Sequence, residues 1–221
     1  MIDDADGGFA PMPRPMGFYV VAPDAEWVGR AARAGADTVQ LRRKDLVGEA
    51  LRSEIRAALR AVEGAGAMLM IDDHWRLAIE EGAFGVHLGQ EDLDSADVEA
   101  IKEAGLRLGV STHADGEIDR ALALRPSYMA IGAIFPTTTK VMPTKPQGLG
   151  KLKAYVRRIR SESSAPIVAI GGIDLGNAES VLACGVDSIA VVRAVTLSDD
   201  PEGAVQAFRR MLIACGKLPQ A

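Results

Sequence analysis

The segment YMAIGAIFPTTTK, residues 128–140, joins an almost entirely apolar run to a polar loop. A continuous apolar run of this kind is typical of a parallel strand that is buried on both faces. Three threonines and a lysine follow where such a strand leaves the core, so hydroxyl and ammonium groups gather at its carboxyl end. Ordinary loop residues explain the same pattern, and the rest of the chain has to decide between a plain loop and a binding site.

Seven further β-type runs occur in the chain, and segments with helical periodicity separate them. The runs cover residues 17–22, 37–42, 67–72, 84–89, 106–110, 166–172 and 187–192. Eight strands, each followed by a helix, predict an α/β fold of the (β/α)8 TIM-barrel type with a single domain. A doubly wound open sheet is the alternative, but the glycine-rich fingerprint of that fold is missing after the first run.

Composition sets the domain organisation and excludes several functional classes. The chain has 221 residues, 48% of them hydrophobic, and a formal net charge of −5, which provides no basic surface for nucleic acid or an anionic membrane. No apolar run approaches the ~20 residues that cross a bilayer. We expect a flexible tail over residues 1–16, a barrel domain over 17–215 and a C-terminal tail over 216–221. We also expect a cytoplasmic location, because no signal peptide is evident and the two cysteines lack metal-ligand spacing. The sequence is compatible with a homo-oligomer and does not define the oligomeric state.

Polar residues stand at the carboxyl ends of nearly all the expected strands, where barrel enzymes carry their chemistry. The second strand ends in Gln40, Arg42 and Lys44, at alternate positions and therefore on one face. Later strand ends and their loops contribute Asp72, Asp73, Asp92, Ser111, Thr137, Thr139, Lys140, Gly172, Val192 and Arg193. Convergence of cations, carboxylates and hydroxyls at one end of the barrel predicts a polar binding site.

The residue types suit two anions. Arg42, Lys44 and Lys140 supply positive charge, and neutral donors accompany them, as a pyrophosphate requires. The glycine pair at the end of the seventh strand and the turn after the eighth suit a second phosphate, held by backbone amides. Asp73 and Asp92 repel anions, so we predict that they bind Mg2+, which is usually held by one or two carboxylates plus substrate phosphates. Capping of the following helices is the alternative for both.

The three histidines receive no catalytic role. His74 is expected at the surface, and His87 is expected as a hydrogen-bonded core residue because it lies within a buried strand pattern. His113 follows the fifth strand and could be a metal ligand together with two aspartates. Such a triad needs a geometry that the sequence spacing does not define, so no ligand role is assigned to His113.

Six motifs, taken in order, resemble the thiamine-phosphate synthase family. They are QLRRK, IDD, GVHLGQEDL, GVSTH, IFPTTTK followed by QGL, and VAIGGI, and the resemblance runs from about residue 17 to residue 201. It implies a transferase of thiamine biosynthesis that joins 4-amino-5-hydroxymethyl-2-methylpyrimidine pyrophosphate to thiazole phosphate and releases pyrophosphate. It also implies a dissociative, Mg2+-assisted mechanism, in which pyrophosphate leaves before the thiazole nitrogen captures the pyrimidine cation.

The resemblance implies individual roles as well. Gln40, Arg42 and Lys44 bind the pyrimidine pyrophosphate, and Lys140 and Ser111 contact its phosphates. The thiazole phosphate is held by Thr137, Thr139, Gly172, Val192 and Arg193. Arg42, Ser111 and Lys140 form the implied catalytic set, and Asp73 and Asp92 carry Mg2+.

Two positions depart from the family pattern. Asp72 stands where asparagine is usual, and its carboxylate weakens pyrophosphate binding unless the metal or Arg42 offsets the charge. Arg193 stands where a small residue such as serine is common, and it either pairs with the thiazole phosphate or turns to solvent.

Two other functions are considered. A thiazole tautomerase, an isomerase on the same barrel, binds thiazole phosphate but has no use for the predicted pyrophosphate-binding residues. A non-catalytic sensor of thiamine phosphate has little support, because no second domain is predicted to report its occupancy.

Overall fold

The computed structural model describes residues 7–139 and 145–220. Within these residues eight parallel strands form a closed barrel in chain order, in which each strand pairs with the next and β8 pairs with β1. The strands are β1 (Phe18–Ala22), β2 (Thr38–Leu41), β3 (Met68–Asp72), β4 (Gly85–Leu88), β5 (Arg107–Thr112), β6 (Tyr128–Ile131), β7 (Ile167–Ile170) and β8 (Ser188–Val191). The predicted TIM barrel is confirmed.

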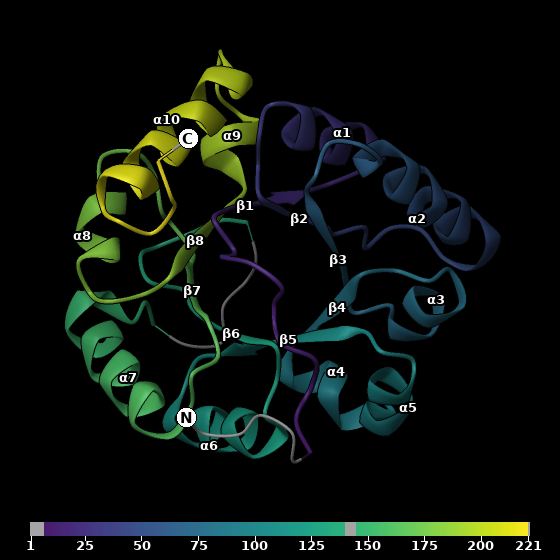
Figure 1. The fold of residues 1–221 in the computed structure, drawn as a ribbon, viewed down its shortest axis with the longest axis horizontal. Helices are drawn as coiled ribbons and strands as arrows, with labels where there is room; N and C mark the ends of the chain where they lie inside the picture. The colour runs from purple at the N-terminus through teal and green to yellow at the C-terminus, as the bar shows by residue number, and fades with distance from the viewer. Residues whose placement is uncertain (1–6, 140–144, 221) are drawn as a thin grey trace.

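Helices surround the barrel as an outer ring (Figure 1). They are α1 (Ala25–Arg33), α2 (Gly48–Val62), α3 (Trp75–Glu80), α4 (Gln90–Ser95), α5 (Val98–Glu103), α6 (Asp115–Leu124), α7 (Gly148–Glu162), α8 (Ala178–Leu182), α9 (Arg193–Thr196) and α10 (Pro201–Ala214). The short helices α4 and α9 were not among the predicted ones, because so few residues carry no periodic signal. No helix in the described part of the chain is long and apolar enough to cross a membrane.

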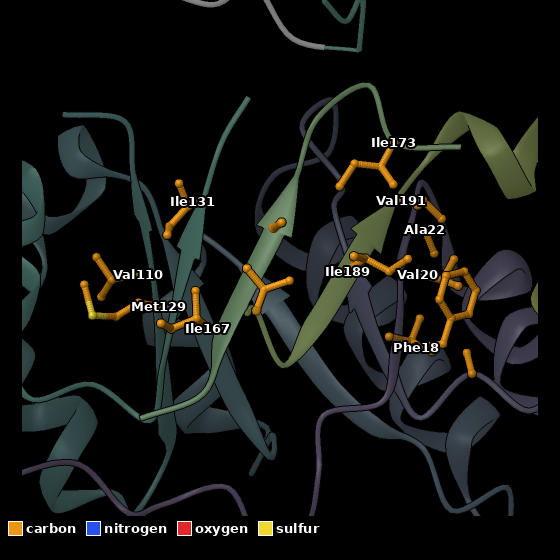
Figure 2. Packing of buried hydrophobic residues seen from close by; sticks show 14 of the residues in the cluster. Phe18, Val20, Ala22, Val110, Met129, Ile131, Ile167, Ile173, Ile189 and Val191 are labelled. Atoms are coloured by element: carbon orange, nitrogen blue, oxygen red, sulfur yellow. The ribbon is translucent and has the colours of Figure 1, made fainter. Parts of the chain in front are cut away.

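Alternate strand residues face the helices and the barrel interior. On β1, Phe18, Val20 and Ala22 belong to the outer cluster that packs under the helices, and Figure 2 shows them beside the equivalent residues of neighbouring strands. Phe18 stacks on Phe208 of α10, with ring centroids 4.6 Å apart. Tyr19 belongs to a second cluster inside the barrel. Polar residues in inward register at the carboxyl ends are therefore directed into the barrel mouth.

Residues 7–16 pack on the amino-terminal end of the barrel (Figure 1). Phe9 and Met16 are buried, at 8% and 1% exposure. The backbone N–H of Phe9 donates to the carbonyl of Arg125 over 3.0 Å, and the Ser127 hydroxyl donates to the carbonyl of Ala10 over 2.6 Å. This part of the segment therefore contributes to the folded structure. The predicted division into a tail over 1–16, a barrel and a C-terminal tail stays a prediction.

Replacing Ser127 by alanine is expected to lower the free energy of unfolding by about 1 kcal/mol, because buried hydrogen bonds of one hydroxyl are lost together. The Ser127 hydroxyl donates to Ala10 and accepts from the Leu108 N–H over 3.0 Å. Urea unfolding followed by circular dichroism measures the change. Ser161→Ala, at the exposed end of α7, is the control. Equal stability of both variants would show that the N-terminal segment is not anchored through this hydroxyl.

Candidate active site

A cavity of about 470 Å³ lies at the carboxyl ends of the strands. Its lining includes all the predicted site residues that the structure describes, namely Gln40, Arg42, Lys44, Asp72, Asp73, Asp92, Ser111, Thr137, Thr139, Gly172, Val192 and Arg193. Lys140, the remaining predicted residue, lies outside the described residues. The fold therefore brings together residues that are far apart in the sequence, while their individual roles stay predictions.

Asp72 forms the centre of the cationic side of the cavity. It is buried, with 6% exposure, and its Oδ1 accepts a hydrogen bond from Gln40 Nε2 over 2.6 Å. Its Oδ2 lies 3.5 Å from Arg42 Nε and 3.3 Å from Lys44 Nζ. A buried carboxylate without a partner would be costly, and the two cations offset this cost for Asp72. Asp72 faces the same cations that the sequence assigns to a pyrophosphate.

Asp73 also pairs with Lys44, and its backbone adopts an uncommon conformation. Its φ is 61°, in the left-handed region that non-glycine residues rarely occupy. The Asp73 N–H donates to the carbonyl of His87 over 2.9 Å, which holds this turn at the end of β3 against β4. Strained residues of this kind cluster at functional sites.

The capping alternative for Asp73 and Asp92 is wrong. The N-cap residues are His74 in α3, Gly89 in α4 and Asp97 in α5, and of these three only Asp97 accepts a backbone hydrogen bond through its side chain. Asp92 lies in the first turn of α4 and lines the cavity. Neither aspartate is therefore a helix cap, and both residues line the cavity.

The two carboxylates fit a metal that arrives with a phosphorylated ligand. The described residues contain no group of three histidine, cysteine or carboxylate side chains able to hold an ion by themselves. Mg2+ keeps several waters and takes one or two protein carboxylates plus phosphate oxygens. Asp73 and Asp92 supply hard oxygen ligands of this kind, although Lys44 is paired with Asp73 in the structure.

The opposite side of the cavity is made of backbone and hydroxyl groups. Gly171 and Gly172 end β7 with φ of 102° and 67°. A Cβ atom at Gly172 would lie 2.6 Å from the carbonyl oxygen of Pro136, so only glycine lets the loops after β6 and β7 approach this closely. At the mouth, the exposed Arg193 begins α9, and its guanidinium donates to the Thr138 hydroxyl. Arg193 therefore lies at the cavity instead of pointing away from it.

Two buried tyrosines, of which Tyr19 lines the cavity, were missed by sequence reasoning. Tyr19 and Tyr128 lie in apolar strand runs and were counted as core, and both are buried. The Tyr19 hydroxyl donates to Gln40 Oε1 over 2.7 Å and lies 2.8 Å from the Tyr128 hydroxyl. Burial raises the pKa of both hydroxyls, so each keeps its proton at neutral pH. Both tyrosines stand at inward-facing strand positions, as Gln40 does, and this shared register was the sequence signal from which they could have been predicted.

His87 continues this set of hydrogen bonds. Its Nδ1 lies 2.7 Å from the Tyr128 hydroxyl, and its Nε2 lies 2.8 Å from Ser111 Oγ. The prediction of a hydrogen-bonded core histidine is confirmed, and His87 also lines the cavity. Gly109 makes the arrangement feasible, because a Cβ atom there would lie 2.2 Å from Cζ of Tyr128.

Comparison with known proteins identifies relatives over almost the whole chain. The family model for thiamine monophosphate synthase matches residues 18–195. A thiamine-phosphate synthase of Neisseria meningitidis serogroup B is 59% identical over 203 residues, which cover 92% of this chain and 98% of the relative. One from Escherichia coli O157:H7 is 52% identical over 192 residues, covering 87% and 90%.

A solved structure agrees with these relatives. The thiamine phosphate pyrophosphorylase of Pyrococcus furiosus superposes with a TM-score of 0.78 at 30% identity, covering 91% of this chain and 97% of that structure. Unrelated enzymes also have the barrel fold, so the fold alone does not identify a family. Sequence identity of 30% or more over nearly complete chains does identify one. The chain belongs to the thiamine monophosphate synthase family.

Proposed function

We propose that this protein is a transferase that condenses 4-amino-5-hydroxymethyl-2-methylpyrimidine pyrophosphate with thiazole phosphate to give thiamine phosphate and pyrophosphate. Family membership supports the reaction class. The observation that carries the proposal is the two-sided cavity, with paired cations at β2 and a glycine-lined wall between the loops after β6 and β7. Two phosphorylated substrates need two such sites.

The cationic side is proposed to bind the pyrimidine pyrophosphate. Arg42 and Lys44 are already held next to each other by Asp72, so little side-chain freedom is lost when an anion binds. Their charge stabilises the negative charge that develops as the carbon–oxygen bond to pyrophosphate breaks. The bonding electron pair leaves with pyrophosphate, and the thiazole nitrogen lone pair then forms the new carbon–nitrogen bond. This chemistry requires no general base and no covalent nucleophile.

Asp73 and Asp92 are proposed to hold Mg2+ beside the pyrophosphate. The ion, when bound, neutralises phosphate charge and so improves the leaving group. The carboxylates of this chain position it, and Lys44 has to release Asp73 as the substrate enters. Ser111 and Lys140 complete the proposed set for the pyrimidine substrate.

The glycine-lined wall is proposed to bind thiazole phosphate. Backbone N–H groups around Gly172 and Val192 and the hydroxyls of Thr137 and Thr139 are the proposed donors, and all four residues line the cavity. The Thr137 hydroxyl already lies 3.3 Å from the backbone nitrogen of Thr139, which keeps the loop compact.

A tautomerase is not favoured. An isomerase acting on thiazole phosphate has no use for the cluster of Gln40, Arg42 and Lys44 around Asp72. The relatives at 59% and 52% identity carry the synthase name. A cytoplasmic location belongs to the proposal too, supported by the free thiols of Cys184 and Cys215.

The test is direct. Purified protein incubated with both substrates and Mg2+ is expected to form thiamine phosphate and pyrophosphate in equal amounts, measured by chromatography. Formation of a rearranged thiazole phosphate without condensation would indicate the tautomerase. Binding of thiamine phosphate without turnover would indicate the sensor.

Replacing Arg193 by serine is expected to raise KM for thiazole phosphate about fivefold, because one exposed charge-assisted contact contributes roughly 1 kcal/mol. The KM for the pyrimidine substrate is expected to stay unchanged, since Arg193 lies at the opposite wall near Thr138. Steady-state kinetics with each substrate varied in turn measure both constants. Arg158→Ser, an ion-paired arginine on α7, is the control. Unchanged KM in the Arg193 variant would remove it from the phosphate site.

A further inference from the structure

The turn that follows β7 presents two backbone N–H groups that have no hydrogen-bond partner among the described residues. They belong to Gly172 and Ile173, which line the cavity and lie in no helix or strand. Successive N–H groups in a turn form a concave site that binds anions. The direction of these two groups therefore decides whether this wall of the cavity holds a phosphate.

The carbonyl groups of the same two peptide units show this direction, because C=O and N–H point opposite ways in a planar trans peptide. The carbonyl of Gly171 accepts from the Phe135 N–H over 3.0 Å, so the Gly172 N–H points away from the loop after β6. The carbonyl of Gly172 accepts from Asn177 Nδ2, also over 3.0 Å. The Ile173 N–H therefore points away from Asn177, which is not one of the described residues that line the cavity.

The Asn177 side chain matches the turn with both ends of its amide. Its Oδ1 accepts from the Asp174 N–H over 3.0 Å, while its Nδ2 donates to the Gly172 carbonyl. A backbone N–H only donates and a carbonyl oxygen only accepts, so these two partners fix the orientation of the amide. A carboxylate at this position serves only the Asp174 N–H, and an apolar side chain serves neither partner. The turn therefore uses an amide side chain at position 177.

Other contacts hold the same turn independently of the Asn177 amide. Asp174 Oδ1 accepts from the N–H groups of Gly176 and Asn177, over 2.8 Å and 3.2 Å. The Ile173 side chain is 5% exposed and packs in the outer apolar cluster (Figure 2). Loss of the amide is therefore expected to release the Gly172 carbonyl while the turn stays folded.

We infer that Asn177 is a positioning residue that holds the Gly172 carbonyl out of the cavity and so directs the Ile173 N–H at a bound phosphate. Resting on the proposed function, this phosphate is that of thiazole phosphate, because the cations proposed for the pyrophosphate follow β2. Without the Asn177 bond, the peptide unit after Gly172 is free to rotate, since glycine permits many backbone conformations. Its carbonyl oxygen, which repels phosphate, then competes with the N–H for the cavity.

The direction of the N–H groups is tested first by NMR of the backbone amides in 15N-labelled wild-type protein. Addition of thiazole phosphate is expected to move the amide proton signals of Gly172 and Ile173 downfield, as hydrogen bonds to a charged acceptor do. Inorganic pyrophosphate with Mg2+ is expected to leave both signals in place. No response of Ile173 to thiazole phosphate, or an equal response to pyrophosphate, would overturn the inference. This measurement requires no variant to fold and no turnover.

Asn177→Ala provides a readout that a general structural role would not give. Affinity for thiazole phosphate, measured by calorimetry, is expected to fall about tenfold, as for weakened hydrogen bonds to a charged group. The KM for thiazole phosphate is expected to rise equally, while kcat and the KM for the pyrimidine substrate stay unchanged. Ser180→Ala is the matched control, because this exposed hydroxyl of α8 donates to the Asn177 carbonyl over 2.7 Å and does not contact Gly172. Unchanged affinity in Asn177→Ala, or equal weakening for both substrates, would contradict the positioning role.

Asn177→Asp separates the two bonds of the amide. It keeps an acceptor for the Asp174 N–H but has no donor for the Gly172 carbonyl, so its affinity for thiazole phosphate is expected to be no better than that of Asn177→Ala. Wild-type affinity in Asn177→Asp would show that the bond to Gly172 is not needed. If the amide response and the tenfold loss are found but no thiamine phosphate forms, the inference stands and the proposed function fails. Synthesis of thiamine phosphate without a response of Ile173 has the reverse meaning.

Discussion

Asp92→Ala is expected to lower kcat for thiamine phosphate formation about a hundredfold, on the order of 3 kcal/mol in the barrier, as for removal of one preorganised electrostatic contact. Asp92 lies in the first turn of α4 and lines the cavity. Asp73 cannot replace it, because the Asp73 carboxylate is itself proposed to hold the same ion. Initial rates at saturating substrates and Mg2+ measure the loss. Binding of thiazole phosphate alone, followed by calorimetry, is expected to stay nearly unchanged.

Asp94→Ala is the matched control for this prediction. Asp94 lies on the same helix, its side chain is 71% exposed, and it pairs with Arg120 over 2.8 Å. The same loss of one carboxylate from α4 is therefore compared at positions inside and outside the cavity. Activity of Asp92→Ala equal to that of the wild type would reject Asp92 as a metal ligand.

The fold was predictable because each barrel strand is buried on both faces and leaves an apolar run in the sequence. All residues of β3 and β4, for example, are buried. The short helices were not predicted, because α9, for example, has only four residues, little more than one helical turn, and so shows no repeating pattern. Packing of Phe9 and Met16 on the barrel was also beyond prediction, because it depends on contacts with distant loops and on no local pattern.

Which residues line the cavity was predictable for a geometric reason. In a parallel barrel all strands end at the same rim, so polar residues at strand ends converge whatever their separation in sequence. Pair contacts depend instead on strand stagger and side-chain direction, which the sequence does not state. Hence Lys44 and Asp72 were both assigned to the site, but their 3.3 Å contact was not predicted. Tyr19 and Tyr128 were taken as core because their rings resemble any apolar neighbour in a strand.

Asp72→Asn is expected to tighten binding of the pyrimidine pyrophosphate about tenfold. The carboxylate lies 3.5 Å from Arg42 and 3.3 Å from Lys44, so it neutralises charge that the pyrophosphate needs. At ~5 Å and an effective dielectric constant of ~20, two unit charges interact by about 3 kcal/mol, and counter-ions reduce this to a smaller net gain. Asparagine keeps an oxygen that can accept from Gln40, so the local structure is retained.

The sign of the effect separates two roles for Asp72. If its carboxylate only repels the substrate, the substitution tightens binding most at low salt and low Mg2+, where screening is weakest. If it is a metal ligand, Asp72→Asn raises the Mg2+ concentration needed for half-maximal rate and slows the reaction. Titration of Mg2+ against initial rate in wild type and variant distinguishes these results. Asp45→Asn, an exposed carboxylate paired with Arg43, controls for general changes in surface charge. Because Asp72 is buried among the two cations, we expect tighter binding, and identical curves for wild type and Asp72→Asn would contradict both roles.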